Sequence, residues 1–155
     1  MSVKPQPDGY HSVTPYLLID GAAAAIEFYR AALGAEELMR LGDDAQIAHA
    51  EIRIGDSVVM LADATTEAFG RCPMALGATC VGLMLYVPDV DARFATALAA
   101  GATEVRPVVD QFYGDRSGML RDPFGHVWTL ATHVEDLTPE QIAARLAAMG
   151  EGTGG

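Results

Sequence analysis

Basic residues and cysteines are scarce in this 155-residue sequence. Lysine and arginine together number 10 against 21 aspartates and glutamates, which gives a net charge of −11 at pH 7. Nucleic acids and anionic membrane surfaces are bound mainly through excess lysine and arginine. The charge balance therefore argues against both as main partners.

Long apolar runs are also missing. The longest nearly apolar stretch extends from Ala78 to Val87, which is too short to span a bilayer, and the first residues contain no apolar leader core. We therefore expect a cytoplasmic protein. The two cysteines, Cys72 and Cys80, belong to no Cys-x-x-Cys pair and no Cys/His cluster. This pattern favours idle thiols, with a strained disulfide or redox pair as the alternative.

Signatures of phosphate-binding loops, dinucleotide-binding turns, hydrolase nucleophile elbows and zinc proteases do not occur. What the sequence does contain is a globular composition, with 50% hydrophobic and 20% charged residues. The length is that of one domain. Nucleotide binding, hydrolase-elbow and zinc-protease functions therefore have no support.

An internal repeat organises the chain. Segment 14–37 aligns with segment 82–104, and segment 55–61 aligns with segment 125–130, at an offset of about 70 residues. Each copy has a β-rich run, an aspartate able to cap a helix (Asp20 or Asp89), an alanine-rich helix ending at a glycine (Gly34 or Gly101), and three further strands. The predicted strands are 13–19, 36–41, 45–54 and 57–62, then 81–87, 104–109, 117–121 and 127–133.

These boundaries predict one α+β domain at 10–137 after an N-terminal tail at 1–9. Module one covers about 10–63, a loose connector covers 64–79, and module two covers about 80–137. Thr138 and Gln141 form a capping box that opens a helix at 139–149, and the remainder of 138–155 is expected to fray.

The strand at 45–54 alternates cleanly between two faces. Ala48, Ala50, Ile52 and Ile54 form an apolar face, and His49, Glu51 and Arg53 form the other. If the apolar face packs against the helices, His49 lies on the open face as a general base, with Glu51 tuning its pKa. The alternative is a solvated sheet face with local charge pairing.

A second group of candidates precedes the last strand. Tyr113 and Arg116 stand among glycines, where the arginine fork can meet a carboxylate or phosphonate, unless it pairs internally with a nearby aspartate. The segment beginning at Asp122 is a turn. We interpret His11, His126 and His133 as structural, and Trp128 as core.

The motifs FYRAALG and DPFGHVW, each set in a βαβββ unit, resemble the vicinal oxygen chelate superfamily of glyoxalases, bleomycin-resistance proteins and dioxygenases. PYL, IAHAEIRIGDSVVMLAD and YGDR are similar to its PhnB-like branch. The resemblance implies two tandem βαβββ modules whose curled mixed sheets surround a cup, plus the C-terminal helix. It also implies a small-molecule site in the cup and a homodimer formed by side-by-side packing or by exchange of modules.

Catalytic members of this superfamily usually hold a divalent metal through histidine, glutamine and glutamate side chains on the first and last strands of each module. By resemblance, those positions fall at Thr14, Met60, Gly82 and Thr129. Glycine has no side chain, and methionine and threonine are poor ligands for divalent ions. We therefore expect no metal at the usual position.

Alternate residues of a strand share a face, so further side chains are expected to line the cup with those four. The predicted ligand-binding residues are Thr14, Tyr16, Met60, Gly82, Met84, Tyr86, Tyr113, Arg116 and Thr129. An apolar and aromatic lining with a few hydroxyls suits an organic ligand.

Three functions stay open at this point. The first is a small-molecule-binding protein without a cofactor, of a sequestration or resistance type. The second is a lyase or isomerase that uses His49 and Glu51, or a divalent metal at a non-standard site. The third is an interaction module that contacts another protein through its acidic surface and C-terminal helix.

Overall fold

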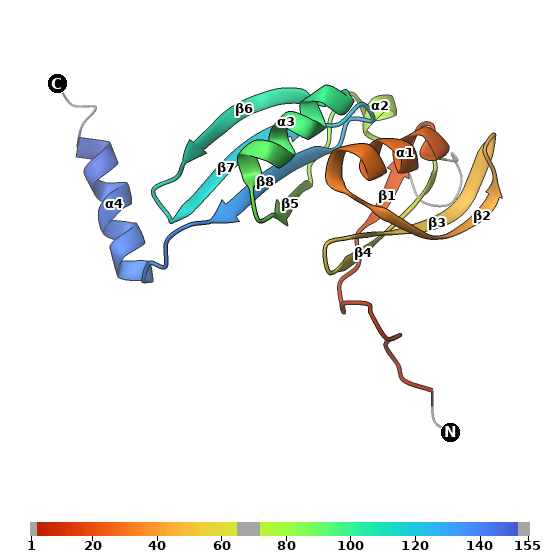
Figure 1. Ribbon diagram of the computed structural model, residues 1–155, viewed down its shortest axis with the longest axis horizontal. Helices are drawn as coiled ribbons and strands as arrows, with labels where there is room; N and C mark the ends of the chain where they lie inside the picture. The colour runs from red at the N-terminus through yellow and green to blue at the C-terminus, as the bar shows by residue number, and fades with distance from the viewer. Residues whose placement is uncertain (1–2, 65–71, 152–155) are drawn as a thin grey trace.

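The computed structural model describes residues 3–64 and 72–151. Two curved four-stranded sheets lie next to each other, with strand orders β1-β4-β3-β2 and β5-β8-β7-β6. Helices α1 and α3 contact each other on one side of the sheets and leave the opposite faces open (Figure 1). The predicted α+β fold of two βαβββ modules with a C-terminal helix is confirmed, and neither sheet closes into a barrel.

The elements of module one are β1 (Tyr16–Ile19), α1 (Ala22–Leu33), β2 (Glu36–Asp43), β3 (Gln46–Ile54) and β4 (Ser57–Asp63). Those of module two are β5 (Gly82–Tyr86), α3 (Val90–Ala100), β6 (Thr103–Asp110), β7 (Asp115–Arg121) and β8 (Val127–His133). Helix α2 (Pro73–Leu76) lies between the modules, and α4 (Pro139–Glu151) follows them.

The first strand of each module pairs in parallel with the last, and the other pairs are antiparallel. The first strand of module one begins three residues later than the predicted 13–19. The predicted connector 64–79 contains a short helix, α2, and its residues 65–71 lie outside the described residues. Both cysteines are free, Cys72 buried and Cys80 exposed.

The two helix starts differ from each other. Asp89 caps α3 as predicted, because its carboxylate accepts a hydrogen bond from the Ala92 N–H at 3.1 Å. Asp20 does not cap α1, and that prediction was wrong. The N-cap residue is Gly21, and the carboxylate of Asp63 at the end of β4 accepts from the Gly21 and Ala22 N–H groups at 3.1 and 2.8 Å. The start of α1 is therefore capped by a side chain from β4, which lies far away in the sequence.

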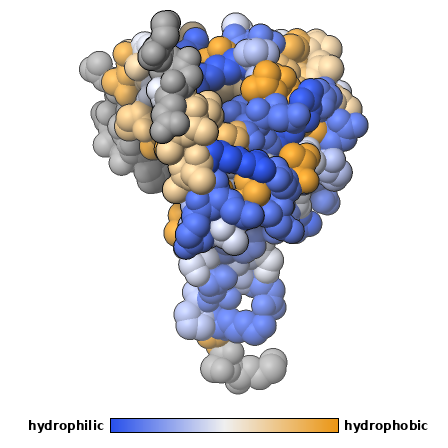
Figure 2. Space-filling model, turned by 90° about the vertical axis from the view of Figure 1, so that its left-hand side faces the viewer, coloured by the Kyte–Doolittle hydropathy of each residue, from blue (hydrophilic) through white to orange (hydrophobic). Residues whose placement is uncertain are grey.

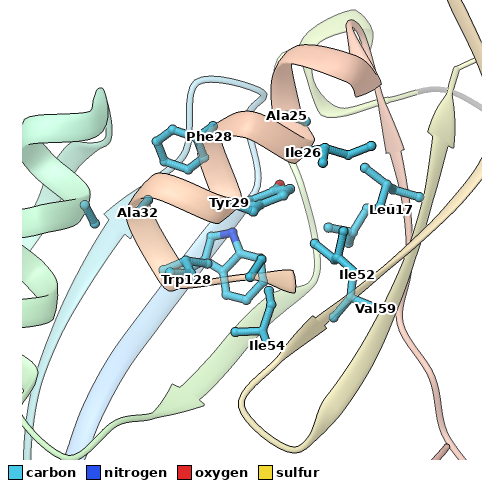
Figure 3. Close-up of a cluster of buried hydrophobic side chains, with 14 of the residues drawn as sticks. Leu17, Ala25, Ile26, Phe28, Tyr29, Ala32, Ile52, Ile54, Val59 and Trp128 are labelled. Carbon is cyan, nitrogen blue, oxygen red and sulfur yellow. The ribbon is translucent and has the colours of Figure 1, made fainter. Parts of the chain in front are cut away.

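One apolar core joins the modules. Figure 3 shows side chains of α1 packed with Leu17, Ile52 and Val59 from module one and with Trp128 from β8 of module two. The rings of Tyr29 and Trp128 lie 5.6 Å apart between centroids. Trp128 is buried in this core as predicted. A single unit of this size buries a small fraction of its surface and is marginally stable alone, so the shared core stabilises both modules.

Asp122 is the polar centre of that core. One carboxylate oxygen accepts from the Tyr29 hydroxyl at 2.6 Å and the Trp128 indole N–H at 3.0 Å. The other accepts from the Phe124 and His126 backbone N–H groups, each at 2.9 Å. The predicted turn is therefore present, and its first residue also connects α1 to β8.

The alternation predicted for β3 holds only in its second half. Ala50, Ile52 and Ile54 are buried on the helix side. At the start of the strand, Ile47 is buried and Ala48 is exposed, the reverse of the prediction. The pairing of β2 with β3 changes register between Leu41 and Gly42, and such an irregularity re-aims the side chains around it.

The chain ends extend from the body. The hydrophilic residues at the N-terminal end form a stem below it (Figure 2). At the other end, the predicted capping box is present: the Gln141 N–H donates to the Thr138 hydroxyl at 3.2 Å, and the Thr138 N–H donates to the Gln141 side chain at 2.9 Å. Within the described part of the chain, no helix has both the length and the apolar character needed to cross a membrane.

Candidate functional site

Four side chains form a hydrogen-bonded row on the open face of module one. The Tyr16 hydroxyl lies 2.8 Å from His49 Nδ1, and His49 Nε2 lies 3.1 Å from Glu51 Oε1. The Tyr10 hydroxyl, from the N-terminal segment, donates to Glu51 Oε2. Strand register assembles the row, because Tyr16 pairs with Met60 across β1–β4 and Met60 pairs with Glu51 across β4–β3.

Glu51 is the hydrogen-bond acceptor in this row. The hydrogen bond from Tyr10 and then that from His49 lower the pKa of Glu51, against the opposing effect of burial. The carboxylate is therefore ionised at neutral pH and only accepts, so His49 carries its proton on Nε2. Burial and then the charge of Glu51 raise the pKa of Tyr16, so this side chain is a phenol at neutral pH. Its hydroxyl meets the other ring nitrogen of His49, Nδ1.

A carboxylate that orients an imidazole, with a phenol on the other ring nitrogen, is an arrangement suited to general acid–base chemistry. It is equally suited to holding a polar group of a ligand. The structure places His49 and Glu51 together on the open face, where the sequence predicted them. The Tyr16 and His49 rings are 5.5 Å apart between centroids, so the phenol also packs against the imidazole.

A hollow of about 550 Å³ lies beside Glu51. Its walls combine the strand residues Glu51 and Met60 with Pro5, Pro7, Tyr10, Thr14 and other residues of the segment before β1. Sequence reasoning missed Tyr10, because it falls in no periodic pattern and the contact to Glu51 spans 41 residues. The segment before β1 is therefore part of the site.

Module two carries a different polar cluster on its open face. The Tyr86 hydroxyl donates to Asp115 Oδ2 at 2.9 Å, and Asp115 Oδ1 lies 2.7 Å from His133 Nδ1. His133 Nε2 lies 2.7 Å from Asp136. Tyr86 was predicted as a ligand-binding residue, but His133 was interpreted as structural. Strand parity could have found it, because Tyr86, Asp115 and His133 share one face.

Hydrogen bonds to Asp115 and then to Asp136 raise the pKa of His133 above its ordinary value of 6.5. A raised pKa in the folded state means that this imidazolium adds stability fully below pH about 6.5, and that the contribution disappears as pH rises through the folded pKa. An NMR titration of the imidazole is expected to show a midpoint above 6.5, and Asp115→Asn is expected to lower it. A wild-type midpoint at or below 6.5 would contradict the described pairing.

Three more of the predicted cup residues, Gly82, Met84 and Thr129, lie on the open face of module two with Tyr86. Met84 pairs with Thr129, and Gly82 pairs with Val127. The hollow beside Glu51 is lined by residues of module one and the N-terminal segment alone. Within one chain, the two open faces lie next to each other (Figure 1).

The four positions at which the superfamily holds a metal do not fit one here. The Thr14 hydroxyl donates to the His11 carbonyl at 3.1 Å, Met60 offers only a thioether, Gly82 has no side chain, and Thr129 offers only a hydroxyl. Across residues 3–64 and 72–151, no group of three or more His, Cys, Asp or Glu side chains has an arrangement that could hold a metal ion.

Arg116 does not reach the open face, contrary to the prediction. It shares strand parity with Gly118, where an added Cβ would lie 2.8 Å from Phe94 of α3, so this side of β7 faces the helix. Its guanidinium binds both oxygens of Asp91 at 2.7 and 2.9 Å and one of Asp110 at 3.1 Å. The fork predicted for a ligand thus pairs within the chain, which was the alternative.

Tyr113, the other residue predicted with Arg116, is half-buried and packs edge-on against Phe112 with ring centroids 5.2 Å apart. His126 is buried, and its Nε2 lies 3.1 Å from the Leu18 carbonyl. His11 lies at the surface, with Nδ1 3.3 Å from the Ser57 hydroxyl. His126 thus has the structural contact predicted for it.

Two fused βαβββ modules, each with a four-stranded mixed sheet, form the fold of this chain, and a hollow lies beside the open face of module one. The profile of the Glyoxalase/Bleomycin resistance protein/Dioxygenase superfamily matches residues 10–130. The chain belongs to this superfamily.

Individual relatives agree with this assignment. The uncharacterized protein Rv0887c of Mycobacterium tuberculosis is 43% identical over 145 residues, covering 91% of this chain and 85% of the relative. The crystal structure of TioX from Micromonospora sp. ML1 is 27% identical with a TM-score of 0.62, over 83% of this chain and all 100% of TioX. A PhnB protein from Bacillus cereus shares the fold at 21% identity and a TM-score of 0.59, over 79% and 99% of the two chains.

Proposed function

We propose that this protein binds a small organic molecule in the hollow beside Glu51 and uses no resident metal to do so. The observation that carries the proposal is the hydrogen-bonded row from Tyr10 to Tyr16, which ends at a hollow of about 550 Å³. This volume is within the usual range for small-molecule sites. Met60 and two prolines supply apolar surface, and the Glu51 carboxylate supplies a fixed acceptor. A ligand with an apolar body and a hydrogen-bond donor fits these walls.

The proposal includes a second copy of the chain as partner. Both open faces expose large apolar side chains: Met39 and Leu41 in module one are 38% and 52% exposed, and Met84 and Tyr86 in module two are 49% and 58% exposed. Pairing two chains would cover these faces and turn each open sheet into one wall of a cup. Sedimentation at micromolar concentration is expected to report a dimer, and Met84→Lys is expected to shift it toward monomer.

We also place the chain in the PhnB-like branch, on the motifs PYL and YGDR and on its likeness to the B. cereus protein.

The binding proposal is tested with a library of neutral and cationic aromatic fragments against the ¹⁵N-labelled full chain. Hits are expected to shift the amide signals of Thr14, Glu51 and Met60. Glu51→Gln is expected to weaken the best hit at least about tenfold, equivalent to about 1.4 kcal/mol. Glu140→Gln on α4 is the matched control, because that carboxylate is exposed and remote from the hollow.

Three results would overturn the binding proposal: hits that never shift signals around the hollow, an equal loss of affinity in both glutamine variants, or a near-stoichiometric metal in protein purified without chelator. In the third case, loss of the metal from His49→Ala would identify His49 as a ligand at a non-standard site.

A second candidate function is proton transfer by a lyase or isomerase, favoured by the contacts that the two ring nitrogens of His49 make with Tyr16 and Glu51. Such an enzyme would exchange an acidic C–H hydrogen of a bound ligand with solvent. In D₂O, NMR is expected to show this exchange with wild-type protein and not with His49→Ala, while the ¹⁵N spectrum reports that the variant is folded. Binding without exchange for every hit would leave the binder function and reject the enzyme.

A further inference from the structure

A second pocket, of about 310 Å³, lies where the two modules meet. We call it the junction pocket. It is bounded by β1, by α2 and the segment after it, and by β5. None of its lining residues lines the hollow beside Glu51. The two cavities are therefore separate.

The lining of the junction pocket is apolar and uncharged. Its apolar residues include Pro15, Leu18, Leu76, Val81 and Leu83, and among the residues that the structure describes no Asp, Glu, Lys or Arg lines it. Such a lining stands out in a chain in which 20% of the residues are charged. A cavity without a charged group would leave any charged ligand desolvated and unpaired, so it selects against ions.

The polar side chains on its wall are already engaged with the chain itself. The Thr79 hydroxyl donates to the Val81 carbonyl at 3.2 Å. His126 contacts the Leu18 carbonyl, and Tyr16 contacts His49. The first contact is local to the segment after α2, and the other two join β1 to the turn before β8 and to β3. With these groups engaged, dispersion and apolar burial are the main attraction for a ligand.

We propose that the junction pocket is a second binding site, which takes one neutral apolar molecule of one or two rings. The volume is at the lower end of the range for organic-ligand sites, and pockets of this kind occur preferentially between packed units. Tyr16 lines the junction pocket and also bonds His49 in the other site. A ligand in the pocket would therefore change the surroundings of the His49 imidazole through the Tyr16 hydroxyl.

Indole, which is neutral and bicyclic, is a suitable probe, and indole-3-acetate is its charged counterpart. Titration of indole into the ¹⁵N-labelled full chain is expected to give saturable shifts at Leu18, Val81 and Leu83, with weaker binding of the acetate. Leu76→Gln is expected to weaken indole binding at least about fivefold, because it replaces pocket-lining apolar surface by an amide. Met74→Gln is the matched control: both side chains lie on α2 and are similarly exposed, at 60% and 57%, but Met74 does not line this pocket.

Sensing through Tyr16 is read from the imidazole signals of His49. Indole is expected to move them in the wild type and to leave them unchanged in Tyr16→Phe, which keeps the ring and removes the hydroxyl. Signals that still move in Tyr16→Phe would overturn this route. The binding site itself is overturned if indole gives no saturable shift, if its shifts centre on Glu51 and Met60, or if the two glutamine variants bind it equally.

Discussion

Replacing Asp122 by alanine is expected to lower the free energy of unfolding by about 4 kcal/mol, because four donors that now meet its carboxylate would be left without an acceptor in the core. Two of them, the Tyr29 hydroxyl and the Trp128 indole, come from different modules. Since domains are typically stable by about 5 to 15 kcal/mol, this loss would bring the protein close to unfolding. Urea denaturation followed by Trp128 fluorescence measures it.

Asp122→Asn keeps the measurement informative if the alanine variant fails to fold. Asparagine retains one carbonyl oxygen for the backbone N–H groups of the turn, but presents an NH₂ group to one pair of donors. We expect an intermediate loss of about 2 kcal/mol. A loss below about 1 kcal/mol for alanine would show that water replaces the carboxylate and that the network adds little.

Asp63→Ala is expected to cost about 2 to 3 kcal/mol, the second-largest effect. Its carboxylate accepts from the Gly21 and Ala22 N–H groups at the start of α1 and from the Ile47 N–H at 2.6 Å in β3. Alanine removes the cap of the helix and the connection between two strands at once. Chemical denaturation gives the loss, and amide hydrogen exchange at Ala22 and Ile47 is expected to speed up.

Asp20→Ala is the matched control. Asp20 directly precedes Gly21, it is exposed, and sequence pattern alone names it as the cap. We expect its replacement to change the free energy of unfolding by less than about 0.5 kcal/mol. If the two variants were equally destabilised, the helix start would depend on local sequence, and the contact across the sheet would be incidental.

The residues that hold the protein together are largely separate from those of the candidate site. Asp122 and Asp63 act at the core, between helices and strands, whereas His49 and Glu51 lie on the open face of the sheet. Glu51 is buried and accepts from Tyr10 and His49, so the ¹⁵N spectrum of Glu51→Gln is compared with that of the wild type before its binding is measured. The exception to this separation is Tyr10, whose contact with Glu51 also positions the N-terminal segment.

Repetition of the fold has not produced a repeated site. Glu51 pairs with Met60 in module one, and the corresponding pair in module two is Met119 and Thr129. The tyrosine–carboxylate–histidine cluster of module two arises elsewhere, from Asp115 and the end of β8. The two open faces thus have different chemistry on a shared backbone plan.

The elements and their faces were predictable because they are encoded locally. Alternation along β3 placed His49 and Glu51 on the open face, and glycine at 34 ended α1 in the left-handed conformation, with φ of 69°. The predicted faces at the start of β3 were wrong because the register shift beside Gly42 leaves no periodic pattern in the sequence. The predicted cap of α1 was wrong because Asp20 is the nearest aspartate in the sequence, whereas packing brings Asp63 to the helix start.

The sequence by itself therefore determined the two βαβββ units and the side of β3 that carries His49 and Glu51, and its resemblance to the superfamily gave Thr14, Met60, Gly82 and Thr129 as the expected metal-ligand positions. Tertiary structure alone decided that Tyr10 meets Glu51, that Arg116 pairs with Asp91, and that His133 joins Tyr86 through Asp115. The physical reason is how far apart in the sequence the interacting residues lie. Periodicity is set by neighbouring residues, whereas these partners are up to 41 residues apart in the chain and meet only after the sheets and helices have packed.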